Sequence, residues 1–254
     1  MNLRQFFNVL VLGAFCFFAQ NSFSQIPNSE IIDSNFIKKN LLKKKLKVAN
    51  SSFEKAEIQK ELGRIFKRLK VYDSSIYHLN QVLILAPKSE NEAFAAYGLF
   101  QIYSIINNKE KAKNSLEFAL ASYEKLPKSY VKYYAQYDAG KYFSKGIEKK
   151  RALDFLLKAK DGFNELGKPT QVMMALKSIA FLHLEMRNYE EASKNYNSLL
   201  TLASSLQDSN RITHSYSGIA KVFNCKNNYD SAIFYYEKAI EIQNNIGKSS
   251  PATY

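Results

Sequence analysis

The sequence predicts an all-α protein made of repeated pairs of antiparallel helices. The first observation is that one surrounding pattern recurs at intervals of about forty residues, centred on Ser75, Ala112, Ala152, Ala192 and Ala232. The second is a spacing of four residues within each half of the pattern, as from Ile219 to Phe223, which puts these side chains on one helical face. The third is that turn-forming residues fall between the expected helices. No segment shows a convincing strand pattern.

Small residues in the first helix of each pair explain how two helices can approach closely. They stand at equivalent positions of the first, third, fourth and fifth repeats, namely Gly63, Gly140, Ala180 and Ala220. A small side chain lets the second helix pack where its own small residue lies, and the flanking aromatic and aliphatic residues fill the remaining space.

The clearest motif is Leu62-Gly63-x-x-Phe66 followed by Pro87. This pattern resembles the tetratricopeptide repeat over roughly residues 53–246. The resemblance implies a right-handed superhelical solenoid of about five repeats, expected at 53–88, 89–127, 128–167, 168–208 and 209–246. Residues 25–52 are expected to form a basic amphipathic capping helix, and residues 247–254 to begin an incomplete further repeat.

Punctuation along the chain supports these boundaries. Four prolines fall between predicted repeats, where they do not interrupt a helix: Pro87, Pro127, Pro169 and Pro251. The pairs 107–108, 187–188 and 227–228 end in Asn and are expected to form the turn between two helices, since Asn tolerates left-handed backbone geometry. Ser51 with Glu54, and Ser89 with Glu92, have the spacing of capping boxes.

The N-terminus has the features of a secretory signal peptide over residues 1–24. Arg4 precedes an apolar stretch, and small residues follow it at Ser22-Phe23-Ser24. We therefore expect an exported protein, periplasmic or secreted; the alternative is anchoring by an uncleaved N-terminal segment. Removal of the peptide would leave a single cysteine, Cys225, without an internal disulfide partner.

The chain is basic, with a formal net charge of +13. Such a surface favours acidic partners, and export makes nucleic acid an unexpected one. The densest basic run lies within residues 36–47, where six lysines alternate with apolar residues: Lys38, Lys39, Lys43, Lys44, Lys45 and Lys47. It is interpreted either as a capping helix with a solvated basic face or as a helix on an anionic membrane surface.

No catalytic, cofactor or metal motif stands out, so we expect a protein that is not an enzyme. His78, His183 and His214 lie in different repeats, and His183 occupies an aromatic core position. The run from Gly162 to Lys168 has the spacing of a phosphate-binding loop, but Pro169 replaces the required Ser or Thr, so we interpret it as a helix end.

The resemblance also implies which residues face a concave groove lined by the first helices. They make a basic, tyrosine-rich set comprising Lys60, Arg64, Lys67, Phe94, Tyr97, Gln101, Tyr134, Tyr137, Lys141, Lys177, Phe181, His214, Ser217 and Lys221. Tyrosine and lysine together suit an acidic or extended polypeptide. The family's clamp for chaperone tails is not expected, because Arg64 and Gly98 occupy positions where it needs other residues.

Two functional hypotheses follow. The first is a non-enzymatic scaffold that binds an acidic or extended polypeptide in this groove. The second is the extracytoplasmic sensory portion of a longer signalling protein, such as a histidine kinase or a helix-turn-helix regulator. An uncapped C-terminal end after Ile246 would favour a covering partner, self-association or a continuing chain.

Overall fold

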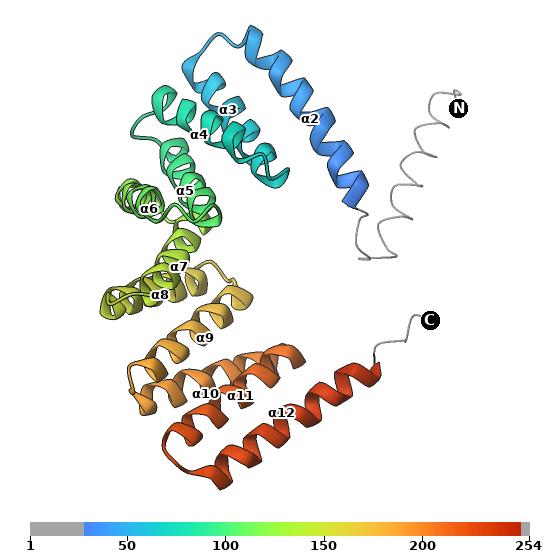
Figure 1. Ribbon diagram of the computed structural model, residues 1–254, viewed down its shortest axis with the longest axis vertical. Coiled ribbons are helices and arrows are strands. Elements are labelled where there is room, and N and C mark those ends of the chain that lie inside the picture. The colour runs from blue at the N-terminus through green and yellow to red at the C-terminus, as the bar shows by residue number, and fades with distance from the viewer. Residues whose placement is uncertain (1–27, 250–254) are drawn as a thin grey trace, which may run out of the picture. The chain divides into compact units, whose positions relative to one another are not determined.

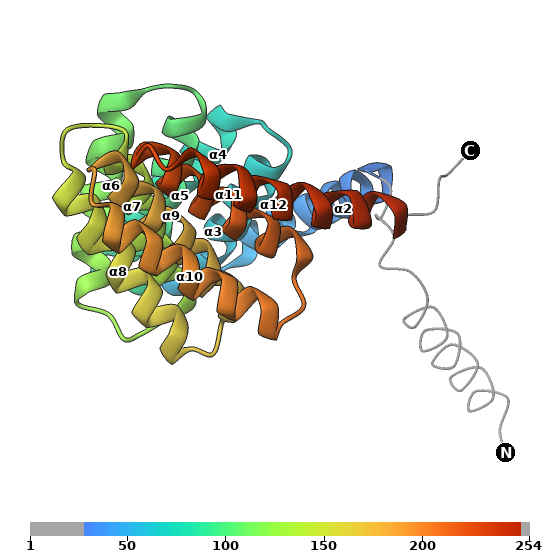
Figure 2. The same ribbon diagram turned by 90° about the horizontal axis from the view of Figure 1, so that it is seen from below.

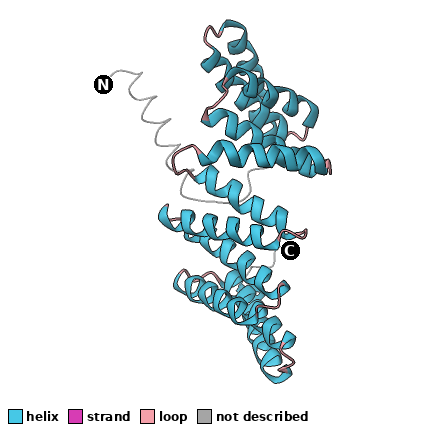
Figure 3. Cartoon of the chain, turned by 90° about the vertical axis from the view of Figure 1, so that its left-hand side faces the viewer, coloured by secondary structure: helices cyan, strands magenta, loops and turns pink. Residues whose placement is uncertain are grey.

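The computed structural model describes residues 28–249, and the side chains of residues 35–245. This part of the chain contains eleven α-helices and no strand (Figure 1, Figure 3). The expected all-α repeat fold is therefore confirmed. The predicted signal peptide at residues 1–24 and the turn at Pro251 lie outside the described residues.

The helices fall into two compact units that divide at Pro87. In the first unit the helices are α2 (Asn28–Val48), α3 (Ser52–Arg68) and α4 (Tyr72–Leu85). In the second they are α5 (Glu90–Ile105), α6 (Lys109–Glu124), α7 (Tyr130–Ser144), α8 (Lys149–Glu165), α9 (Pro169–Glu185), α10 (Tyr189–Ser205), α11 (Ser209–Cys225) and α12 (Tyr229–Ser249). The continuity of one solenoid through Pro87 stays a prediction.

Each expected repeat corresponds to one helix pair, from α3 with α4 to α11 with α12, and the helices of each pair contact each other. In the second unit each second helix also contacts the first helix of the next pair. The C-terminal boundary differs from the expectation, because α12 runs through Gly247 to Ser249. Gly167, in contrast, ends its turn with a φ of 61°.

The small residues lie where the helices come closest. Ala112, Ala152, Ala192 and Ala232 are all buried. A Cβ atom at Gly140 would lie 2.5 Å from Cγ of Leu156, far inside normal contact distance. The hydroxyl of Ser75, the polar residue of the series, donates a 2.7 Å hydrogen bond to the carbonyl oxygen of Gly63. The expected close approach of paired helices is therefore confirmed.

The turns use left-handed residues, at the first position of each pair, so the expectation of a left-handed Asn holds at Asn107 and Asn227 but not in the middle turn, where Arg187 takes this conformation. Asn107, Arg187 and Asn227 have φ values of 58°, 58° and 59°. In each turn the amide of the next residue bonds back to a carbonyl five residues earlier, for example Asn108 N to Tyr103 O at 2.8 Å. This is the Schellman arrangement, which satisfies carbonyls left over at a helix end.

The expected helix starts are also present. The Ser51 and Ser89 hydroxyls accept hydrogen bonds from the amides of Glu54 and Glu92. The Glu54 carboxylate accepts from the amide of Asn50, one residue before the position that a regular capping box uses. No helix within the described residues is long and apolar enough to cross a membrane.

Candidate functional site: the first-helix face of the second unit

The first helices of the second unit, α5, α7, α9 and α11, carry most of the predicted groove residues. We call the surface formed by their equivalent side chains the first-helix face. The structure places them at different depths: Tyr97 and Tyr137 are buried, Gln101 and Tyr134 are half-buried, and the exposed residues are Lys141, Lys177, His214 and Lys221. The buried tyrosines thus belong partly to the packing between helices, while the lysines remain accessible.

Two tyrosines form rungs between neighbouring first helices. The Tyr97 hydroxyl of α5 donates a 2.7 Å hydrogen bond to Oδ2 of Asp138 on α7. The Tyr137 hydroxyl of α7 lies 3.2 Å from Oγ of Ser178 on α9. Because Ser178 itself donates to the Met174 carbonyl, the Tyr137 hydroxyl is the donor in this rung. In both rungs the partners are 41 residues apart, so the repeat produces the same bond twice.

The third rung has different chemistry. One repeat later, the tyrosine position holds Lys177 on α9 and the acceptor position holds Gly218 on α11. A Cβ atom at Gly218 would lie 2.2 Å from Cε1 of Tyr196, so the ring of Tyr196 leaves no room for a side chain there. The equivalents of Tyr196 in the two preceding repeats are the smaller Leu156 and Leu116. Lys177 therefore has no acceptor of the kind that Asp138 and Ser178 provide.

The surroundings of Lys177 are positively charged. Partial burial, followed by the positive charges of Lys221 and Arg211, lowers the pKa of the Lys177 ammonium group. Arg211 is ion-paired with Asp208, which also caps the start of α11. His214, one turn further along α11, donates from Nδ1 to the Asn210 carbonyl at 2.6 Å. The C-terminal half of the first-helix face is therefore cationic.

No carboxylate within α9 or α11 offsets Lys177. The sequence of α11 contains neither Asp nor Glu, and α9 contains only Glu185, two turns beyond Lys177. The Glu185 carboxylate already accepts a 2.8 Å ion pair from Lys149 of α8. An anionic group from outside the chain would thus meet a cation that lacks an equivalent partner within these two helices.

The N-terminal half of the face is aromatic. The ring of Tyr134 contacts the rings of Tyr130, Tyr137 and Phe163, with centroids 5.6 to 6.0 Å apart. The Lys141 ammonium lies 5.5 Å from the Tyr137 ring centroid, within cation–π range. Gln101 hydrogen-bonds to Tyr97, whose pKa is raised by burial and by the charge of Asp138. This half of the face therefore offers a ligand ordered aromatic rings to pack against, and few unbonded hydroxyl groups.

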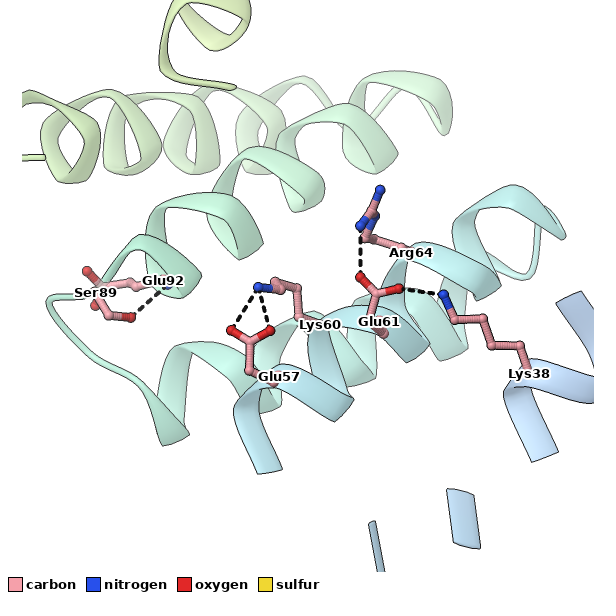
Figure 4. A network of polar contacts seen from close by, with 7 residues as sticks. All are labelled: Lys38, Glu57, Lys60, Glu61, Arg64, Ser89 and Glu92. Carbon is pink, nitrogen blue, oxygen red and sulfur yellow. Dashed lines mark hydrogen bonds and ion pairs between the residues drawn. The ribbon is translucent and has the colours of Figure 1, made fainter. Parts of the chain in front are cut away.

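The predicted groove residues of the first unit, Lys60, Arg64 and Lys67, lie on α3. Figure 4 shows the Lys60 ammonium against both carboxylate oxygens of Glu57, at 2.9 and 2.8 Å. The Glu61 carboxylate binds Arg64 at 2.8 Å and Lys38 of α2 at 3.1 Å. The proximity of these cations outweighs the effect of burial and lowers the pKa of Glu61. Much of the positive charge on α3 is therefore neutralised by its own helix.

Comparisons with known proteins agree with this architecture. Residues 171–245 match the family model of the tetratricopeptide repeat. This segment therefore carries tetratricopeptide repeat sequence. The match covers most of α9, all of α10 and α11, and most of α12, which follow one another at the C-terminal end of the described chain (Figure 1, Figure 2). No curated protein matches the chain significantly.

Solved structures extend the likeness of fold to most of the chain. BtubC (BKLC) from P. vanneervenii is 13% identical, with a TM-score of 0.73 over 91% of this chain and 96% of that one. YrrB, described as a TPR protein with an unusual peptide-binding site, is 18% identical, with a TM-score of 0.61 over 80% and 92%. A Rap protein complexed with Competence and Sporulation Factor is 17% identical, with a TM-score of 0.55 over 86% and 72%.

Two of the three histidines, His183 and His78, belong to the packing between helices. The His183 side chain is buried at the core position expected from the sequence, and burial lowers its pKa. His78 is also buried, stacks on Phe66 and lies 2.5 Å from Oε1 of Gln59. Cys225 is exposed. Among residues 35–245, whose side chains the structure describes, no cluster of His, Cys, Asp and Glu has the arrangement of a metal site.

Sequence reasoning missed two features of the site. It did not identify Asp138 and Ser178 as partners of the tyrosines, although the common separation of 41 residues was visible. It also did not weigh Glu57 and Glu61, each three residues before a predicted basic groove residue, a spacing at which helical side chains meet. Both omissions made the predicted groove look more uniformly basic than it is.

Proposed function

We propose that the protein is a non-enzymatic interaction scaffold that binds an extended, acidic polypeptide along the first-helix face, with Lys177 as the main carboxylate contact. The single observation that carries this proposal is the altered third rung, in which a lysine replaces tyrosine and the acceptor position is Gly218. A partner carboxylate would take the place that Asp138 and Ser178 occupy in the preceding rungs.

The charge around Lys177 supports an acidic ligand over a neutral one. The pKa of Lys177 is lowered by burial and by Lys221 and Arg211, so the free protein holds like charges near one another. A bound carboxylate would relieve this repulsion and form charge-assisted hydrogen bonds, which are stronger than neutral ones. Lys221, exposed on α11, would extend the same favourable potential along the peptide.

The aromatic half of the face would supply the remaining contact. Tyr130 and Tyr134 present partly exposed rings that are held by neighbouring aromatic side chains. Because these rings are already ordered, they lose little conformational entropy when a peptide packs on them. YrrB, described as having an unusual peptide-binding site, and the Rap protein, complexed with Competence and Sporulation Factor, support this class of ligand for a related fold.

The test is fluorescence anisotropy with a labelled hexaglutamate peptide whose C-terminus is amidated, using the full chain. We expect binding that weakens between about 50 and 300 mM salt, since exposed charge pairs are screened. Lys177→Gln should weaken binding by about tenfold, the order expected for a lost charge-assisted hydrogen bond. Lys194→Gln is the matched control. Lys194 is an exposed lysine with the same charge, but it lies on α10, the second helix of its pair, and so outside the first-helix face.

Equal weakening by Lys177→Gln and Lys194→Gln would mean that the peptide senses only net charge. An absence of binding by the unaltered chain would refute the acidic ligand itself. A Gly-Ser peptide with a free C-terminal carboxylate separates recognition of acidic side chains from recognition of a chain end. Stronger binding of this second peptide would assign the lysine to a terminal carboxylate.

A second test leaves Lys177 in place and supplies it with an internal partner. The double variant Tyr196→Leu with Gly218→Asp reproduces the combination of Leu116 and Asp138 found two repeats earlier. We expect it to lose affinity for hexaglutamate because the new carboxylate occupies the ammonium group. Tyr196→Leu with Gly218→Ala repacks the same space without a carboxylate and should retain binding.

A second candidate function, the sensory portion of a longer signalling protein, is favoured by the outer surface of α12. Ile233, Phe234 and Ile240 are large apolar residues exposed on this last helix. In earlier repeats the second helix packs against the next first helix, as Tyr196 does against Gly218. A continuing chain or a second copy would cover this surface. Genomic sequence beyond Tyr254 tests for a continuing chain. Light scattering of the full chain tests for a second copy.

A further inference from the structure

Helix α2 has two apolar sides. On one side Leu42 and Leu46 pack against Ile58, Leu62 and Phe66 of α3. Lys38 lies toward the same neighbour and forms its ion pair with Glu61. This side explains why α2 attaches to the first unit, and it uses only part of the helix's apolar surface.

The other side is a row of exposed apolar residues. Ile37, Leu41 and Val48 are 68%, 52% and 71% exposed, although residues of this type are usually buried. At about 100° per residue they fall within about 40° of one another, and lie roughly 130° from the centre of the side that packs on α3. We call this row the outer stripe of α2.

Lysines flank the outer stripe on both sides. Lys44 and Lys45 lie next to it on the helical projection, Lys47 lies further round, and all three are exposed. No Asp or Glu occurs between Asp33 and Glu54, so this stretch of sequence holds six lysines without an acidic residue. An apolar stripe between basic flanks is the pattern of a helix that lies in the interface of an anionic bilayer.

We propose that the outer stripe of α2 docks the protein on an anionic lipid surface, with Ile37, Leu41 and Val48 entering the headgroup region and Lys44, Lys45 and Lys47 at the level of the phosphates. This is a second binding surface, independent of the first-helix face. The charge pattern selects lipid because both flanks of one narrow stripe are cationic, as a continuous anionic plane requires.

The test reads the position of α2 directly, so that attachment through any other part of the chain does not obscure it. In the full chain, Cys16 and Cys225 are changed to Ser, and Leu41→Cys carries an environment-sensitive nitrobenzoxadiazole dye. We expect a blue shift and increased emission with vesicles that mix phosphatidylglycerol and phosphatidylcholine. The same dye at Tyr77→Cys, an exposed position on α4, is the matched control and should remain unshifted.

The lysines are tested by changing Lys44, Lys45 and Lys47 together to Gln in the Leu41→Cys protein. The lipid concentration for half of the spectral shift should rise by about two orders of magnitude, since each lysine near an anionic surface contributes to binding. As a charge-matched control, the same three-fold change is made at Lys145, Lys158 and Lys194, exposed lysines of the second unit.

Three outcomes would overturn the proposal. A dye at position 41 that stays in a water-like environment on vesicle-bound protein would show that the outer stripe does not enter the interface. An equal shift with pure phosphatidylcholine would remove the role of the anionic lipid. A shift that appears with rising protein concentration in the absence of vesicles would assign the stripe to contact between copies of the chain.

Discussion

Gly218→Ala tests whether the ring of Tyr196 is the reason why position 218 has no side chain, and therefore no acceptor, in the third rung. The new methyl carbon would lie 2.2, 2.4 and 2.6 Å from three carbons of the Tyr196 ring, whereas carbon atoms pack at about 3.5 to 4.0 Å. The ring is enclosed, so it cannot simply rotate into solvent. Overpacking of this kind costs about 1–3 kcal/mol, offset by about 1 kcal/mol because Ala favours the helix over Gly. We expect a net loss of stability of up to about 2 kcal/mol.

The same change should behave differently when the ring is absent. In a Tyr196→Leu background, which matches the leucines of the two preceding repeats, Gly218→Ala should cost nothing or stabilise by up to about 1 kcal/mol. The two substitutions are therefore expected to be non-additive by about 1–3 kcal/mol, the overpacking cost that only the Tyr196 background carries. Hydrogen exchange of α9 to α11 amides measures this locally, as helical repeats unfold in parts. An equal effect of Gly218→Ala in both backgrounds would refute the idea that the Tyr196 ring excludes a side chain at position 218.

Two further predictions concern buried polar groups. Burial, aided by the charge of Lys43, lowers the pKa of His78 from 6.5 to about 4, so the unfolded chain binds a proton more readily. The free energy of unfolding of the first unit should therefore be highest above pH 6.5 and fall by about 2–3 kcal/mol as the pH drops toward 4. In the variant His78→Gln, the urea midpoint of unfolding should depend on pH much less than in the unaltered protein. Tyr97→Phe should destabilise the contact between α5 and α7 by about 1–2 kcal/mol, because Asp138 loses a donor at 2.7 Å; unchanged exchange of α7 amides would contradict this.

The sequence was sufficient to predict the helix pairs because their packing is short-range and repeated. The alanines at forty-residue intervals and Gly140 mark contacts between consecutive helices, and all of them lie where expected. The left-handed turn at Asn107 follows from local backbone preference. These features depend on residues near one another in the chain, and the fivefold repetition of the pattern made each one easier to recognise.

The candidate site was predicted less well because its chemistry depends on which side chains pair across helices. The pattern identified Tyr97 and Lys60 as groove residues, but their partners, Asp138 and Glu57, had to be found by geometry. Position within a repeat determines where a side chain points. It does not determine whether the polar atom at its end is already bound, and that second property decides what a ligand can use.

This distinction also explains why a single lysine can matter more than the net charge of the chain. Lys60 forms an ion pair with Glu57, and Arg64 forms one with Glu61. An acidic ligand would therefore have to compete with carboxylates already in place. Lys177 differs because the repeat that positions it has also removed the matching acceptor at position 218. A ligand carboxylate there replaces water and like-charge repulsion, not an existing ion pair. Affinity for an acidic peptide should therefore follow the pairing state of each cation, with the loss at Lys177 larger than at Lys60 although each removes one positive charge.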